Sequence, residues 1–348
     1  MTEIVPNLVS TIIPVYNRPD MLREAVQSVL DQTYRPIEIL IADDGSTDSE
    51  TLRVGEELER QHPGVIKFLR KENSGPGPTR ELGRQHARGE FIQYLDSDDL
   101  LRPHKFELMV QALREHPECG AAYGYICVHP LNKPPHEQPY KGSGIVRETL
   151  FPWLLADRWW NTDCPLFRRS VCDAVGPWTD IRWSQDWEYD GRVAALGTKL
   201  VHVPDWVCDE RHHTTGRQTD TADWLRPERL INRKRFMELM LSHAERGGVD
   251  EFTPQRQHFT RWVFTTARHA AAAGLISEAR QLLDLAEKSA GSCREVRKGF
   301  VPFRMLANII GWKTTGWLLH RIEKFRRPTS GFTMQESFAR DLQQKGNQ

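Results

Sequence analysis

Residues 8–48, LVSTIIPVYNRPDMLREAVQSVLDQTYRPIEILIADDGSTD, contain the pattern of a strand, a helix and a second strand. The apolar runs 8–15 and 37–42 are short and rich in β-branched residues, which is typical of buried strands. Between them, the apolar positions of 22–30 recur every three to four residues, so they share one face of a helix that Asn17 is expected to cap. Such a unit predicts two neighbouring parallel strands joined by a helix.

The same alternation continues along the chain. It predicts further strands at 65–69, 91–95, 121–128, 199–203 and 206–210, and helices at 47–61, 79–87, 103–116 and 186–196. The remainder is expected to be helical only, at 224–246, 254–273, 275–290 and 301–326. The sequence therefore predicts an α/β domain over 1–220, with a mostly parallel sheet flanked by helices, and an all-helical region over 221–348.

Composition excludes several classes of protein. The 348 residues carry 47 Lys and Arg against 47 Asp and Glu, and this balance argues against a general nucleic-acid binder. The first ten residues lack the basic and apolar regions of a secretory signal. The longest apolar run, 305–312, is far shorter than the ~20 residues that span a bilayer. Six cysteines without a CxxC pair are expected to be reduced and buried, which favours a cytoplasmic location.

Acidic side chains follow two of the predicted strands. Asp43 and Asp44 end one strand, and Asp96, Asp98 and Asp99 end another. Ligands of open α/β sheets bind beyond the carboxyl ends of the strands, and crowded carboxylates repel one another unless a cation neutralises them. Oxygen ligands suit Mg²⁺ or Mn²⁺ shared with substrate phosphates. The alternative is a turn and helix-capping cluster, with Asp99 as the cap.

Four segments in order resemble the inverting, GT-A-fold nucleotide-sugar glycosyltransferases of family 2. They are STIIPVYN (10–17), ADDGSTD (42–48), GEFIQYLDSDD (89–99) and QDWEYDGRVAALG (185–197). The resemblance covers residues 7–215 and implies the GT-A fold, with a nucleotide-binding half at 1–128. It places the acceptor and the catalytic base in a second half, 129–220.

The resemblance assigns several residues to the nucleotide. Pro14 corresponds to the strand end whose backbone touches it, and Asp44 to the carboxylate that accepts the uracil N3–H, which makes UDP the expected donor nucleotide. An ordinary Asp-Gly turn is the alternative for Asp44. Asn73 and Arg80 match polar residues that contact the nucleotide half. The glycines of the loop 73–78 would let the backbone approach the ligand.

The metal site is also carried over from the resemblance. Asp98 of the DXD motif would bind Mn²⁺ or Mg²⁺ directly, while Asp96 would contact the ribose or a metal-bound water. His213 would complete the metal site or hold the pyrophosphate, and Arg211 would neutralise phosphate. Glu210 stands where the family has a tyrosine. The ion would stabilise the charge on the departing UDP.

Asp186 is the predicted catalytic base. It would take the proton of an acceptor hydroxyl as that oxygen attacks the anomeric carbon. Gln185 stands where the family commonly has Glu. Glu188 and Asp190 are alternative bases, and a mere helix N-terminal charge is the alternative role for Asp186.

The resemblance therefore implies an enzyme that moves a sugar from a UDP-sugar to an acceptor hydroxyl by a single, metal-assisted displacement. A hexosyl- or N-acetylhexosaminyl-transferase of bacterial-type surface polysaccharide or glycoconjugate synthesis is expected, with a glycan, lipid-linked or protein-linked acceptor. A nucleotidyltransferase is one alternative, although the segment PVYNRPD stands where its basic phosphate loop would be. A catalytically degenerate nucleotide- or glycan-binding scaffold is the other.

Two further segments have open interpretations. Residues 129–162, with Trp153, Trp159 and Trp160, line either the acceptor side or the core. Residues 294–327 contain nine Lys or Arg, two Glu and interleaved aromatic residues. They either dock peripherally on the inner face of a membrane or pack their aromatic side chains on the protein.

Overall fold

The computed structural model describes residues 3–213 and 225–326, and of residues 323–326 only the backbone. Contacts divide the chain into two units. The sheet unit comprises residues 1–150 and 159–217, and the helical unit comprises residues 151–158 and 218–348. Residue 327, the last of the predicted membrane-docking segment, lies outside the described residues.

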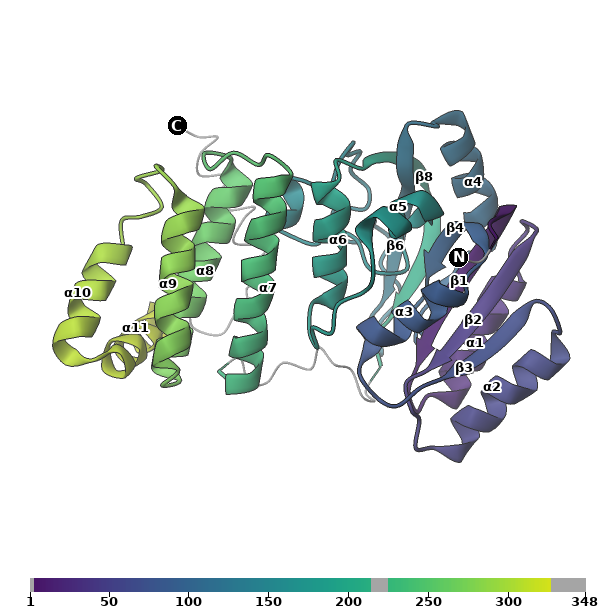
Figure 1. Cartoon of the computed structure of the whole chain (residues 1–348), viewed down its shortest axis with the longest axis horizontal. Coiled ribbons are helices and arrows are strands. Elements are labelled where there is room, and N and C mark those ends of the chain that lie inside the picture. Colours follow the sequence, from purple (N-terminus) through teal and green to yellow (C-terminus); the bar gives the residue numbers. More distant parts are fainter. Residues whose placement is uncertain (1–2, 214–224, 327–348) are drawn as a thin grey trace. The chain divides into compact units, whose positions relative to one another are not determined.

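An eight-stranded mixed sheet forms the centre of the sheet unit (Figure 1). Its strands are β1 (Val5–Val15), β2 (Ile37–Asp43), β3 (Ile66–Arg70), β4 (Gly89–Tyr94), β5 (Leu100–Leu101), β6 (Cys119–His129), β7 (Leu166–Arg168) and β8 (Lys199–Arg211). The order is β3-β2-β1-β4-β7-β6-β8-β5. Strands β3, β2, β1 and β4 are mutually parallel, β7 is antiparallel to both neighbours, and β5 is antiparallel to β8.

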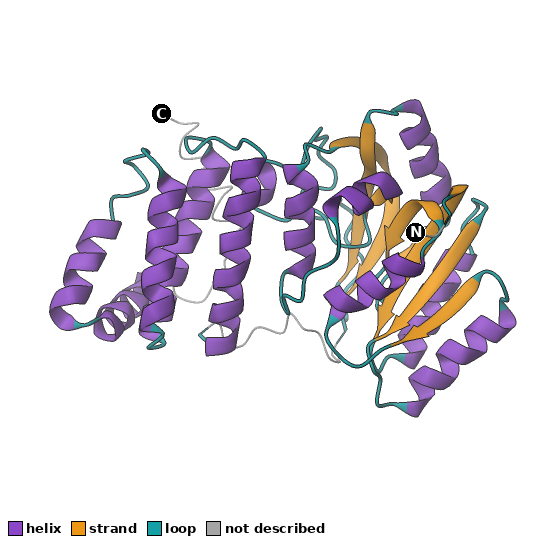
Figure 2. Ribbon diagram, in the orientation of Figure 1, coloured by secondary structure: helices purple, strands orange, loops and turns teal. Residues whose placement is uncertain are grey.

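Helices cover this sheet (Figure 2). They are α1 (Pro19–Leu30), α2 (Ser49–Gln61), α3 (Pro76–His86), α4 (Lys105–Glu115), α5 (Arg169–Val175) and α6 (Gln185–Ala195). Residues 8–15 of β1 and the whole of β2 are buried and mostly apolar, as in parallel sheets that helices cover on both faces. The predicted α/β fold with a GT-A-like sheet and a helical C-terminal region is confirmed.

Some local predictions were wrong. Helix α3 begins at Pro76, three residues early, and β7 and α5 were not predicted. β8 is one strand rather than two, because a register shift against β6 accommodates Pro204. Asn17 does not cap α1: it has a φ of 51°, and its side chain accepts hydrogen bonds from the Thr47 and Asp48 amides.

Within its described residues, the helical unit contains the 3₁₀ helix η1 and five α-helices. Their bounds are η1 (Trp153–Leu155), α7 (Pro227–Arg246), α8 (Pro254–Ala272), α9 (Ile276–Ala290), α10 (Phe300–Ile310) and α11 (Trp312–Arg326). Helix α8 packs against α9, α11 and η1. The predicted helix 301–326 is broken at Gly311, whose φ of 90° ends α10. Among the helices of residues 3–213 and 225–326, we find none with the length and apolarity required to cross a membrane.

All six cysteines are buried and free of disulfides, as predicted. The acceptor-side interpretation fails for Trp159 and Trp160, which are each 2 % exposed and belong to the core of the sheet unit. Trp160 donates to the Asp190 carboxylate over 2.9 Å. Trp153 is 37 % exposed and belongs to the helical unit instead.

Candidate active site

The predicted nucleotide and metal residues follow strands that end at one edge of the sheet. Strands β1, β2 and β4 are parallel, so their carboxyl ends share that edge. Pro14 pairs in register with Ala42, and the Asp44 amide donates to the Val15 carbonyl over 2.9 Å. The Leu95 amide, directly before Asp96, donates to β1 as well. The topology therefore assembles the strand-end residues, as the sequence predicted.

The Asp44 carboxylate organises the loop that precedes α3. It is 6 % exposed and accepts hydrogen bonds from the Ser74 and Gly75 amides, both over 2.9 Å. Lys71 Nζ lies 3.2 Å from the same carboxylate, while Asn73 is exposed on this loop. The loop is thus folded around Asp44, a role beyond that of an ordinary Asp-Gly turn.

The two glycines of this loop are required for different reasons: Gly75 for its backbone conformation and Gly77 for its lack of a side chain. Gly75 has a φ of 93° with open space around its missing Cβ, and it precedes the first turn of α3. A Cβ on Gly77 would lie 2.2 Å from the Thr179 carbonyl oxygen and 3.7 Å from Cγ of Gln185. The close approach at Gly77 is therefore to the segment leading into α6, and the approach of this loop to a ligand stays a prediction.

Arg80 connects the two ends of the site. Its side chain is 3 % exposed, donates to Asp96 over 2.5 Å and lies 4.9 Å from the ring centre of Trp178. Burial lowers the pKa of Arg80, but the charges of Asp96 and Asp186 outweigh burial, and the net pKa is raised. The guanidinium is thus a fixed cation close to the DXD turn and to the start of α6.

Asp98 and His213, which the resemblance assigns to the metal, lie next to each other. His213 Nε2 is 2.8 Å from Asp98 Oδ2, and Arg18 Nη1 is 2.8 Å from the same oxygen. Burial acts to raise the pKa of Asp98, but Arg18 and His213 together hold it below its ordinary value. Sequence reasoning missed Arg18, although its place directly after the first motif was the available signal.

A second cluster of carboxylates adjoins the DXD turn. Asp96, Asp99 and Asp163 each bring one oxygen within 4.8 Å of the others, and Asp163 accepts from the Asp96 amide over 2.7 Å. Burial and the charge of Asp96 raise the pKa of Asp163 to about 7, and burial and Asp163 raise that of Asp99. Asp163 was missed because it belongs to no recognised motif, and because the strand that follows it, β7, is too short to show a periodic pattern.

Arg211 joins the end of β8 to the DXD turn. Its amide donates to Asp99 over 2.7 Å, and its Nε donates to the Asp98 carbonyl over 2.7 Å. It also pairs with Glu24 of α1. Asp99 is therefore an acceptor for β8 rather than the predicted helix cap, since α4 begins only at Lys105.

Asp186 is the second residue of α6 and is half-buried. Its carboxylate accepts from the Trp187 amide over 2.9 Å. The other acids of α6 serve the core: Glu188 is 1 % exposed and bonded to Thr179 and Arg192, and Asp190 is 3 % exposed and bonded to Trp160. Of the three candidate bases, the geometry favours Asp186, because a base must reach a substrate.

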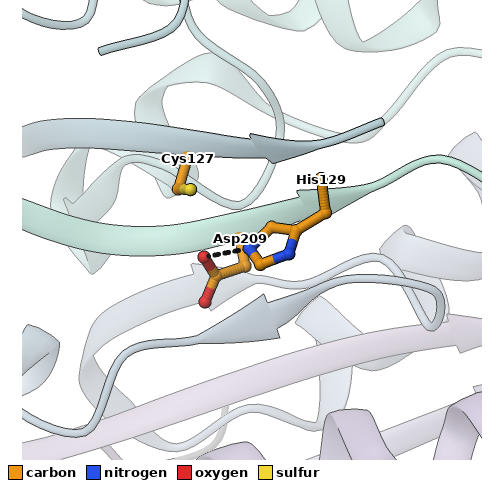
Figure 3. Close-up of side chains that lie close together, drawn as sticks. All are labelled: Cys127, His129 and Asp209. Atoms are coloured by element: carbon orange, nitrogen blue, oxygen red, sulfur yellow. Dashed lines mark hydrogen bonds and ion pairs between the residues drawn. The ribbon is translucent and has the colours of Figure 1, made fainter. Parts of the chain in front are cut away.

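Another group of possible metal ligands lies between β6 and β8. Cys127, His129 and Asp209 each offer one atom within 4.8 Å of the others, and the His129 ring points at Asp209, 2.8 Å away (Figure 3). Arg102 donates to the same Asp209 oxygen over 2.6 Å. Arg102 and Asp209 form an ion pair, joined by His129, that links the loop after β5 to the sheet.

Comparisons with known proteins find similarity to glycosyltransferases. A model described as glycosyl transferase family 2 matches residues 10–176. An uncharacterised glycosyltransferase of Rickettsia conorii is 37 % identical over 165 residues, which are 47 % of this chain and 25 % of the relative. The chain spans 25 % to 55 % of the length of the first curated relatives it matches.

Solved structures resemble the fold. Staphylococcus aureus TarS is 15 % identical, with a TM-score of 0.62 over 93 % of this chain and 56 % of that chain. Its residues 1–349 in complex with UDP-GlcNAc give 16 % identity and a TM-score of 0.55, over 82 % of this chain and 91 % of that one. The Pyrobaculum calidifontis mannosyltransferase PcManGT, in complex with GDP-Man and Mn²⁺, gives 19 % identity and a TM-score of 0.51 over 91 % and 86 %. With its four motifs assembled on this fold, the chain resembles glycosyl transferase family 2, whose model matches residues 10–176.

Proposed function

We propose that this chain is an inverting glycosyltransferase that moves a sugar from a UDP-sugar to an acceptor hydroxyl. One observation carries the proposal: Asp96 of the DXD turn forms an ion pair with the buried Arg80, and the charge of Asp186 of α6 raises the pKa of the same side chain. A carboxylate on the donor side and a candidate base are thus close to one cation. A displacement needs both groups within reach of one anomeric carbon.

Asp186 would act as the general base. Its carboxylate would accept the proton of the acceptor hydroxyl while that oxygen forms the bond to the anomeric carbon and the bond to the nucleoside diphosphate breaks. One such displacement inverts the anomeric configuration. The charge of Asp186 acts to raise the pKa of the buried Arg80, so a fixed cation would lie near the proposed base.

Asp98 and His213 would hold a divalent ion, with Asp96 beside them. The residues offer donors for such an ion: His213 Nε2 lies 2.8 Å from Asp98 Oδ2, next to the cluster of Asp96, Asp99 and Asp163. Burial, with the neighbouring carboxylates, raises the pKa of Asp99 and of Asp163. Mn²⁺ or Mg²⁺ would supply positive charge against the departing diphosphate. The Mn²⁺ complex of PcManGT supports a metal.

Residues 1–128 would bind the nucleotide, and residues 129–220 would supply the acceptor site and the base. Asp44 would accept the uracil N3–H, the Pro14 backbone and Asn73 would contact the nucleotide, and Arg211 would neutralise phosphate. The UDP-GlcNAc complex of TarS supports a UDP-sugar, whereas the GDP-Man complex of PcManGT makes GDP the main alternative.

The transferred group and pathway follow from the family only in outline. We propose a hexosyl or N-acetylhexosaminyl transfer in the cytoplasm, in surface polysaccharide or glycoconjugate synthesis, onto a glycan, lipid-linked or protein-linked hydroxyl. A nucleotidyltransferase and a degenerate binding scaffold are the rival functions. Asp98 and Asp186 are both present, which argues against the scaffold.

A donor panel tests the proposal. UDP-, GDP- and dTDP-sugars are each added with Mn²⁺ to the full chain, and thermal unfolding and nucleoside diphosphate release are followed without acceptor. A bound donor at about 100 times its Kd stabilises by ~2.7 kcal/mol, a clear shift in Tm. We expect the UDP-sugars to stabilise and to be slowly hydrolysed. Stabilisation by GDP- or dTDP-sugars alone would contradict the donor assignment. Stabilisation without turnover would favour the scaffold, and pyrophosphate release from a nucleoside triphosphate and a sugar phosphate would favour the nucleotidyltransferase.

A further inference from the structure

Helix α10 exposes an apolar face to water. Val301, Met305 and Ile309 recur every four residues along one side of the helix and are 62 %, 60 % and 77 % exposed. The buried side of the helix carries Phe300 and Phe303. A helix with apolar side chains on opposite sides is normally buried on both of them, so we expect another molecule to cover the exposed face of α10.

Helix α11 extends this surface. It packs against α10, and both lie at one end of the helical unit in Figure 1. Among the described residues, eight of the 18 large exposed apolar side chains fall within 301–322. We name these eight the α10–α11 face: Val301, Met305, Leu306, Ile309, Ile310, Trp317, Leu318 and Ile322.

The charge around the α10–α11 face is positive. Among the side chains that the structure describes in 294–322, six are Lys or Arg and one, Glu295, is acidic. Five of the basic side chains are exposed: Arg294, Arg297, Lys298, Lys313 and Arg321. The sixth, Arg304, pairs with Asp284 and Glu287 of α9. The Arg321 guanidinium lies 4.5 Å from the ring centre of Trp317, so basic and aromatic groups are interleaved.

We propose that the α10–α11 face docks on an anionic lipid surface, with Val301, Met305 and Ile309 at the acyl boundary and the basic side chains among the headgroups. Short amphipathic helices with basic and aromatic residues lie in the membrane interface in this way. A second copy of the chain fits less well, since a two-fold interface would bring the same positive charges together. This inference is independent of the proposed transfer reaction.

Vesicle co-sedimentation of the full chain tests the inference. We expect binding to vesicles of phosphatidylcholine and phosphatidylglycerol in equal parts, weak binding to phosphatidylcholine alone, and release by high salt. The double variant Met305→Ser with Ile309→Ser should abolish binding. The pair Lys298→Glu with Lys313→Glu should weaken it at least about tenfold. These residues are exposed, so the variants should unfold at the wild-type temperature.

Matched controls separate the face from general surface effects. Ile231→Ser, 45 % exposed on α7, and Lys133→Glu in the sheet unit should bind vesicles like wild type. Absence of wild-type binding to anionic vesicles would overturn the inference, as would loss of binding in the controls as well as in the face variants. Light scattering is run on the same samples: a dimer that Ile309→Ser dissociates, without vesicle binding, would assign the face to a second copy instead.

Discussion

Replacing Arg80 with Met removes a buried cation from beside two carboxylates of the site. Breaking a fully buried ion pair costs about 3–5 kcal/mol, because the remaining charge is left without compensation. The Asp96 side chain is 32 % exposed, so water can solvate part of its charge. We therefore expect a loss below that range, about 2–3 kcal/mol, with the packing on Trp178 largely kept by Met.

Thermal unfolding measures this loss. For a domain of about 150–250 residues, 1 kcal/mol shifts Tm by ~2–4 °C, so Arg80→Met should lower the Tm of the sheet unit by about 4–12 °C. Arg80→Lys keeps the charge and should lose less. Arg53→Met, at an exposed pair with Glu50, is the matched control and should leave Tm unchanged. A Tm for Arg80→Met equal to that of the control would refute the assignment of Arg80 as the cation of the site.

Three further predictions follow from local geometry. Gly77→Ala should destabilise the sheet unit by about 1–3 kcal/mol in a denaturant titration, because its Cβ would lie 2.2 Å from the Thr179 carbonyl oxygen; an unchanged midpoint contradicts this packing. Asp98→Asn and His213→Ala should each weaken Mn²⁺ binding at least about tenfold by isothermal titration, and equal affinity in both variants and wild type would remove them from the metal site. Burial lowers the pKa of His202 below 6.5, so its contribution to stability is present above pH 6.5 and lost as the pH falls through the lower, folded value. His202→Gln should therefore show a smaller fall of Tm between neutral and mildly acid pH, and parallel Tm curves would exclude this contribution.

The parallel half of the sheet was predictable because its strands are continuous apolar runs separated by amphipathic helices. Those two periodicities are local properties of the sequence. The antiparallel half of the sheet was harder to predict from the sequence. β7 has three residues, too few to show any period, and β8 contains Pro204, which reads as a break unless the register shift against β6 is known.

The site was predictable where position along the chain implies position in space. Residues after parallel strands must meet at one edge, so Asp44 and Asp98 were found. Arg18 and Asp163 were missed, because their partners lie 80 and 67 residues away. Arg18 directly follows the first motif, but its pairing with Asp98 exists only in the folded chain. The steric role of Gly77 likewise depends on Thr179, a contact that only the folded chain creates.

The most direct test of the account is donor binding and transfer by Asp186→Asn. The Asn side chain can still accept the hydrogen bond from the Trp187 amide, so the start of α6 should be preserved. Asp190→Asn, which can keep its bond to Trp160, is the matched control on the same helix. We predict that Asp186→Asn binds the UDP-sugar with Mn²⁺ like wild type, while its transfer or hydrolysis rate falls by about 10²–10⁴. Wild-type turnover in Asp186→Asn, or an equal loss in Asp190→Asn, would contradict the assignment of the base.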